Sequence, residues 1–184
     1  MNIAQEFPDN SVVLLVGVAG SGKSTFAKNI FGSNSLIVSS DECRKEICGD
    51  EANQSVTAQA FELFYKKIEE GLIFGQRVIA DATNIDKFGR EKIYSIARKY
   101  NVTICAVVFN ISINIIKKQN RMRERVVPEY AIDKMYKKMR NTYFQIRNEI
   151  SSENLLFINK PIDYESVLDM NSNKIKQYSY KKLD

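Results

Sequence analysis

The chain has 184 residues, of which 44% are hydrophobic and 27% are charged, a composition typical of one globular domain with its own core. Its formal net charge of +5 favours polyanionic partners, although many basic proteins bind no nucleic acid. The sequence holds no histidine, which excludes Ser-His catalysis and zinc-His sites within this chain.

The cysteine pattern and the hydropathy indicate where the protein works. Cys43, Cys48 and Cys105 are odd in number and form no C-x-x-C motif, a pattern typical of reduced thiols. The longest apolar run is far shorter than a membrane span, and the N-terminus lacks the pattern of a signal peptide. We expect a cytoplasmic protein with no membrane partner, and the sequence leaves its oligomeric state open.

The first predicted strand, residues 12–16, leads into a phosphate-binding motif. Residues 17–24 read GVAGSGKS and fit G-x-x-x-x-G-K-[ST], and a helix is predicted over residues 25–30. The glycines let backbone N–H groups approach phosphates, Lys23 can reach the β and γ phosphates, and the Ser24 hydroxyl can ligate Mg²⁺. We therefore predict that the chain binds ATP, or another nucleoside triphosphate, with Mg²⁺. The predicted nucleotide-binding residues are Gly17, Ala19, Gly20, Ser21, Gly22, Lys23, Ser24 and Thr25.

The second predicted strand, residues 36–38, is followed by the polar segment SSDECR at residues 39–44. Ligands of open α/β sheets bind beyond the carboxyl ends of the strands, so Asp41 is placed to take a proton from a substrate hydroxyl. Arg44 lies one helical turn later, on the same face, where it can bind an anionic group next to that hydroxyl. The alternative is a capping box of Ser39 and Glu42, with Asp41 as an ordinary first-turn acid. Beside a phosphate-binding loop, we favour the catalytic interpretation.

The third predicted strand, residues 77–80, follows a helix predicted over residues 55–74 and ends in Asp81-Ala82-Thr83-Asn84. An Asp in this position of a P-loop fold commonly reaches the Mg²⁺ shell or the P-loop Ser, so we predict a metal site at Asp81 and Ser24. The alternative is a cap for the next predicted helix, residues 86–100, a task that Asn84 or Asp86 could also fill.

A basic block lies between residues 114 and 147, after the predicted strand 103–109. Phosphoryl-transfer enzymes use mobile arginines to stabilise charge on the transferred group. We predict that Arg123 and Arg125 belong to such a lid, whereas the later lysines lie on the exposed face of a helix over residues 128–150, with Pro128 in its first turn. A solvated helix face without a lid would give a similar pattern.

The alternation of strands and helices, completed by a strand at residues 155–158, predicts the fold class. We expect an α/β P-loop phosphotransferase fold: a parallel sheet of about five strands, flanked by helices, with an arginine-bearing lid. Residues 1–170 are predicted to form one kinase domain. Residues 171–184 form a polar, Lys-rich tail, with a loop at residues 171–173, that either docks or frays.

With these segments assembled, the chain resembles the kinase module of bacterial polynucleotide kinase-phosphatases, RNA-repair enzymes that phosphorylate 5′-hydroxyl ends. The likeness runs in order from about residue 12 to residue 160. It rests on GSGKSTFAK at 20–28, SSD at 39–41 with Cys43-Arg44, NQSVT at 53–57, DATN at 81–84, AVVFN at 106–110, and Arg125 with Glu129-Tyr130.

The resemblance implies a role for each matching position. Lys23 and Ser24 would hold ATP and Mg²⁺, and Asp41 would be the general base. Arg44 would bind the phosphate beside the attacking 5′-hydroxyl of an RNA or DNA end. On the substrate side, the implied contacts are Gln54 and Asn84, and the implied lid residues are Arg123 and Arg125.

One position departs from the family pattern. The family places an arginine before the Asn of its lid helix, whereas this sequence has Gln119-Asn120, with Lys118 and Arg121 as the nearest cations. An arginine lost from the nucleotide side costs transition-state stabilisation unless a neighbour replaces it. The motifs of the family's phosphatase and ligase modules are not found in this chain, so the resemblance is to the kinase module alone.

Three functions are compatible with the sequence. The first is an ATP-dependent polynucleotide 5′-hydroxyl kinase. The second is a small-molecule P-loop kinase that acts on a sugar, nucleoside or antibiotic hydroxyl with the same Lys23, Ser24 and Asp41. The third is a nucleotide-binding module without catalysis, which the departure at Gln119 keeps open.

Overall fold

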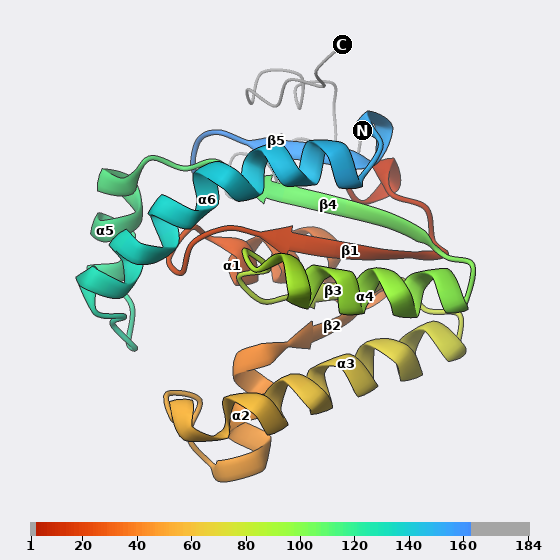
Figure 1. Ribbon diagram of the computed structural model, residues 1–184, viewed down its shortest axis with the longest axis horizontal. Helices are drawn as coiled ribbons and strands as arrows, with labels where there is room; N and C mark the ends of the chain where they lie inside the picture. Colours follow the sequence, from red (N-terminus) through yellow and green to blue (C-terminus); the bar gives the residue numbers. More distant parts are fainter. Residues whose placement is uncertain (1–2, 163–184) are drawn as a thin grey trace.

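The computed structural model describes residues 3–162, and its centre is a parallel sheet of five strands in the order β2-β3-β1-β4-β5 (Figure 1). The predicted fold class is therefore confirmed. The strands are β1 Ser11–Val16, β2 Leu36–Ser39, β3 Val78–Asp81, β4 Thr103–Phe109 and β5 Leu155–Ile158.

The strands are short apolar runs because the sheet is covered on both faces. Every residue of β1, β3 and β5 is buried, as expected for a parallel sheet between layers of helices. The predicted bounds of β4 and β5 are confirmed, and those of β1 and β2 differ by one residue. The third strand was predicted from Arg77 but begins at Val78; the Arg77 guanidinium lies against Asp9 and the Phe7 carbonyl.

The helices lie on both faces of the sheet. Crossover connections in parallel sheets are right-handed, so the strand order puts α1 on one face and α3, α4 and α6 on the other, as Figure 1 shows. The helices are α1 Lys23–Phe26, continued by a π-helical segment Ala27–Phe31, α2 Ser40–Cys48, α3 Thr57–Ile73, α4 Lys87–Lys99, α5 Ile113–Arg121 and α6 Glu129–Glu149.

Side-chain caps fix where two of these helices begin. The Ser39 hydroxyl accepts the Glu42 backbone N–H at 3.4 Å, so half of the capping box considered as the alternative interpretation is present at α2. Asp86 caps α4 by accepting the Phe88 backbone N–H at 3.0 Å. Pro128 was predicted in the first turn of its helix, but α6 begins one residue later and Pro128 holds extended backbone before it.

A buried ion pair locks the C-terminal half of α6 to α4. Arg90 is fully buried, and its guanidinium donates to both carboxylate oxygens of Glu149, at 2.8 and 2.9 Å, and to the Ile85 carbonyl at 2.8 Å. The Tyr94 hydroxyl donates to the same carboxylate at 2.9 Å. One end of α6 is therefore fixed beside the loop that follows β3, while its other end carries the predicted lid.

Two further sequence predictions concern the C-terminal tail and membrane-spanning helices. The predicted tail, residues 171–184, lies outside the described residues. Within the described part of the chain, no helix combines the length and the apolar character needed to cross a membrane.

Candidate active site

The phosphate-binding loop connects β1 to α1 at the carboxyl edge of the sheet. Gly20 and Gly22 have φ of 86° and 93°, left-handed values that favour glycine. A side chain at Gly20 would also be crowded, since a Cβ there would lie 3.3 Å from the Ile116 carbonyl oxygen and 3.4 Å from the Asn120 Cβ of α5. The loop therefore approaches α5 closely.

Lys23 is buried in this loop. Its Nζ donates to the Val18 carbonyl at 2.9 Å, and only 7% of the residue is exposed. Burial lowers the pKa of Lys23 to about 8; Asp81 opposes that shift, and Arg123 adds to it by charge repulsion. Burial disfavours the charged form of Lys23, and the phosphates of a bound nucleotide would stabilise it.

Asp81, at the end of β3, supports the P-loop serine. Burial raises the pKa of Asp81, while the Lys23 charge and a hydrogen bond with Ser24 act in the opposite direction. A buried carboxylate beside a hydroxyl is an all-oxygen donor pair of the kind Mg²⁺ uses, with phosphates and water completing its shell. Residues 3–162 hold no cluster of three or more His, Cys, Asp or Glu side chains suited to a metal. The pair Ser24 and Asp81 fits a nucleotide-borne Mg²⁺ rather than a closed protein cage.

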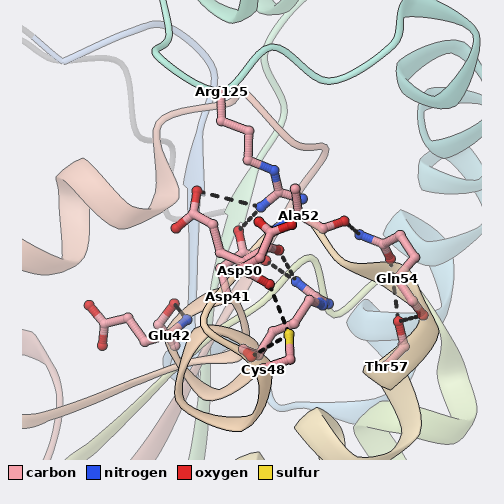
Figure 2. A network of polar contacts seen from close by, with 11 residues as sticks. Asp41, Glu42, Cys48, Asp50, Ala52, Gln54, Thr57 and Arg125 are labelled. Carbon is pink, nitrogen blue, oxygen red and sulfur yellow. Dashed lines mark hydrogen bonds and ion pairs between the residues drawn. The ribbon is translucent and has the colours of Figure 1, made fainter.

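Asp41 lies in the first turn of α2, and each of its oxygens faces an arginine. Its Oδ1 accepts Arg44 Nη1 at 2.6 Å, and its Oδ2 lies 3.3 Å from Arg125 Nη1 (Figure 2). Arg44 therefore lies on the predicted face. Its residue is 5% exposed, its Nη1 also donates to the Glu51 carbonyl at 3.0 Å, and its buried Nε has no hydrogen-bond partner in the described structure.

The segment between α5 and α6 forms a loop with a pinned base, which we call the lid loop (residues 122–128). The buried side chain of Asn120 donates to the Val127 carbonyl at 2.8 Å and accepts the Val127 N–H at 3.0 Å. The tip of the loop carries Arg123 and Arg125 toward the P-loop and α2. Since Asn120 also packs against Gly20, the base of the lid loop lies next to the phosphate-binding loop.

A cavity of about 880 Å³ joins the P-loop, α2, the start of α3 and the lid loop. Its volume is within the range of ligand pockets. The predicted site residues that line it are Ala19, Gly20, Gly22, Lys23, Ser24, Thr25, Asp41, Arg44, Gln54, Asp81, Arg123 and Arg125.

Three predicted site residues do not line this cavity. The Gly17 N–H donates to the Thr83 carbonyl and the Ser21 N–H to the Val18 carbonyl, so neither amide is free for a phosphate. Asn84, predicted to contact substrate, has φ of 49° and donates its side-chain amide to the Leu15 and Ala80 carbonyls at 2.9 Å. In the structure Asn84 ties the ends of β1 and β3 together.

The structure shows where Gln119 and the cations near it lie. Gln119 lines the cavity, and its buried Oε1 has no hydrogen-bond partner among residues 3–162. Arg121 is held at the surface by Glu129 at 2.7 Å, and Lys118 is exposed outside the cavity lining. The lid cation close enough to Lys23 to lower its pKa is Arg123.

Sequence reasoning missed two groups of residues. Glu51 contacts both arginines beside Asp41, and its place just before the Asn53-Gln54 motif was the one available signal. The cavity also has an apolar wall from α3, the lid loop and α6. The members of this wall are Phe61, Val126, Val127, Pro128, Tyr130, Ala131 and Met135.

Comparison with known families shows to which family the chain belongs. A family model described as AAA domain (AAA_33) matches residues 12–143, which span both the P-loop and the lid loop. The chain belongs to this AAA domain family. With the five-stranded parallel sheet, the match establishes a P-loop kinase-type fold, which implies nucleotide binding.

Solved structures of several different proteins are similar to this chain. A chain of the Pnkp1/Rnl/Hen1 RNA repair complex is 25% identical with a TM-score of 0.65, over 76% of this chain and 46% of that one. This AAA domain chain therefore spans about half the length of that relative. A gluconokinase from Sinorhizobium meliloti 1021 is 14% identical with a TM-score of 0.58, over 87% of this chain and 88% of that one. A chain of the AvrRxo1-ORF1:-ORF2 complex with ATP is 10% identical with a TM-score of 0.64, over 87% of this chain and 57% of that one.

Proposed function

We propose that the protein is an ATP-dependent kinase that transfers the γ-phosphoryl group to the 5′-hydroxyl end of RNA or DNA. The observation that carries the proposal is the pair of arginines on either side of Asp41. Arg44 keeps a buried Nε–H without a partner, and this donor suits an anionic group next to the acceptor hydroxyl. A neutral sugar has no such group, whereas a polynucleotide end carries a phosphate there.

The cavity then divides into a donor side and an acceptor side. On the donor side, Lys23 and Arg123 bind the β and γ phosphates, and Arg123 takes the place of the arginine absent at Gln119. Mg²⁺, held through Ser24 with Asp81 behind it, would neutralise phosphate charge. On the acceptor side, Arg44 binds the adjacent phosphate, and Gln54 lines the path of the strand.

Asp41 would act as the general base in an in-line transfer. It orients the 5′-hydroxyl and takes its proton as the hydroxyl oxygen bonds to the γ phosphorus, while the bond from that phosphorus to the bridging oxygen of ADP breaks. The 25% identity to a chain of an RNA repair complex supports the choice of a nucleic-acid acceptor. The three free cysteines support a cytoplasmic location.

The test is transfer of label from γ-labelled ATP to RNA and DNA oligonucleotides of one sequence. We expect 5′-hydroxyl ends to be labelled and 5′-phosphate ends to remain unlabelled. The Asp41→Asn variant should lose about 10²-fold or more in turnover and keep its KM for ATP, since the base acts on the acceptor. The matched control is Glu42→Gln, which changes the neighbouring exposed acid and should stay within about twofold.

Two outcomes would contradict the proposal. Labelling of sugars or nucleosides, with no labelling of either oligonucleotide, would establish a small-molecule kinase instead. ATP binding without transfer to any acceptor would leave only a nucleotide-binding module.

A further inference from the structure

Glu51, in the loop after α2, is linked to both arginines beside Asp41. Its backbone carbonyl accepts Arg44 Nη1 at 3.0 Å, and its carboxylate Oε1 lies 3.7 Å from Arg125 Nη1. The side chain of Glu51 is 43% exposed, so it can move without disturbing the core.

The two arginines differ in how firmly they are held. Arg44 is buried and fixed by a 2.6 Å contact to Asp41 and by the Glu51 carbonyl. Arg125 sits on the lid loop, with 25% of its side chain exposed and with longer contacts of 3.3 Å to Asp41 and 3.7 Å to Glu51. The same atom, Arg125 Nη1, makes both contacts, so its guanidinium lies between two carboxylates. A small displacement moves it from one to the other.

This geometry creates a conflict at Asp41. Both of its oxygens face an arginine in the structure, as Figure 2 shows for Arg125. A base must offer one oxygen to the substrate hydroxyl at hydrogen-bond distance. The oxygen with the longer contact is Oδ2, and freeing it requires a second place for the Arg125 charge. Within the described residues, Glu51 is the other carboxylate in ion-pair range of Arg125.

We propose that Glu51 is a positioning residue that receives Arg125 when the acceptor hydroxyl engages Asp41, so that the lid loop stays closed while the base becomes free. The inference rests on the proposed role of Asp41 as the base. Without Glu51, Arg125 would pair with Asp41 alone and compete with the substrate.

Enzyme kinetics test whether the Arg125 side chain moves from Asp41 to Glu51. Glu51→Gln should lower kcat about tenfold and leave the KM for ATP unchanged, whereas Glu51→Asp, which keeps the charge, should recover most of the rate. Glu42→Gln, which removes an exposed charge that makes no contact with Arg125, is the matched control and should stay within about twofold. Because Glu51 acts through Arg125, the Arg125→Gln variant and the double variant that combines Arg125→Gln with Glu51→Gln should have equal rates. Losses that multiply in the double variant would overturn the proposal.

Hydrogen exchange tests the same contacts without relying on turnover. In Asp41→Asn, Glu51 should retain Arg125, and the amides of residues 122–126 should exchange no more than about twofold faster than in the wild type. Removing both carboxylates, in Asp41→Asn with Glu51→Gln, should speed their exchange about tenfold. If Asp41→Asn alone speeds exchange as much as the double variant, Glu51 does not hold the lid loop. This result would be distinct from a failure of the kinase assay, which would instead refute the proposed function.

Discussion

At the scale of single residues, the site depends on charged groups held away from water. Lys23 is the clearest case, because burial brings its pKa to about 8 before any phosphate is present. Protonated Lys23 is therefore less favourable in the empty site than in the unfolded chain at neutral pH. A bound phosphate reverses this balance, since an opposite charge favours the ammonium form.

We predict that nucleotide binding takes up a proton at Lys23. With a pKa near 8 in the empty site, about half of the Lys23 side chains are neutral at pH 8, and phosphate contact should raise uptake to about 0.5 proton per nucleotide. At pH 6.5 Lys23 is already charged, and its uptake should approach zero. Titration calorimetry of MgATP in buffers of different ionisation enthalpy measures this number.

An exposed lysine of the following segment provides the control for that titration. Lys28→Ala should bind MgATP with the same proton uptake, because Lys28 lies outside the cavity lining. Equal uptake at the two pH values would show that Lys23 is fully charged in the empty site and would contradict the prediction.

At the scale of elements, the lid loop joins a fixed base to a loosely held tip. Asn120 pins the base through Val127, and the Arg90–Glu149 pair holds the far end of α6 against α4. The tip makes ion-pair contacts of 3.3 and 3.7 Å through Arg125. Movement is thus expected in the lid loop, residues 122–128, and not in the C-terminal half of α6.

The α4–α6 ion pair should contribute strongly to stability. Breaking a buried pair leaves the Arg90 charge uncompensated, so Glu149→Gln should lower the free energy of unfolding by about 3 kcal/mol at pH 7. The control is Glu91→Gln on α4, where the partner Arg98 is 3.8 Å away at the surface, and its effect should be below about 1 kcal/mol. Urea unfolding measures both, and equal effects would contradict a special role for the buried pair.

The same pair gives a pH dependence with a defined sign. Burial opposes ionisation of Glu149, but hydrogen bonds from Arg90 and Tyr94 outweigh it, and the pKa of Glu149 falls below its ordinary value of 4.5. A lowered carboxyl pKa contributes stability that is complete above 4.5 and is lost as the pH falls below it. The difference between wild type and Glu149→Gln should therefore shrink below pH 4.5.

At the scale of the whole molecule, the strand order brings the chemistry together. The connection from β1 runs along one face of the sheet and the connection from β3 along the other, which opens a crevice at their carboxyl ends. The P-loop and Asp81 lie in this crevice, and Asp41 reaches it from the end of β2. Residues far apart in sequence thus surround one cavity.

The net charge of +5 leads to a prediction about long acceptors. If the acceptor is a polynucleotide, phosphates beyond the terminal one contact surface lysines and arginines, and each contact adds about 0.7 to the slope of log KM against log salt. The KM for a 5′-hydroxyl oligonucleotide should therefore rise more steeply with salt than the KM for a nucleoside 3′-monophosphate. Equal slopes would confine recognition to the cavity itself.

The local patterns of the sequence predicted much of this molecule. The phosphate-binding motif required glycines with free backbone angles, and the apolar runs required a buried parallel sheet, so both could be read without coordinates. The Ser39 cap was visible because its partner is three residues away. The hydrogen bond of the Asn84 side chain could not be predicted, since its partner Leu15 belongs to a strand 69 residues earlier.

By itself, the sequence determined the fold class, the phosphate-binding loop and the charged residues that line the cavity, because each depends on neighbouring residues and on strand-end positions. The tertiary structure alone decided which arginine faces which partner. Arg123 lies near Lys23, Arg125 lies between Asp41 and Glu51, and Arg121 is held at the surface by Glu129. Such pairings depend on how the lid loop folds over α2, and no local spacing encodes that contact.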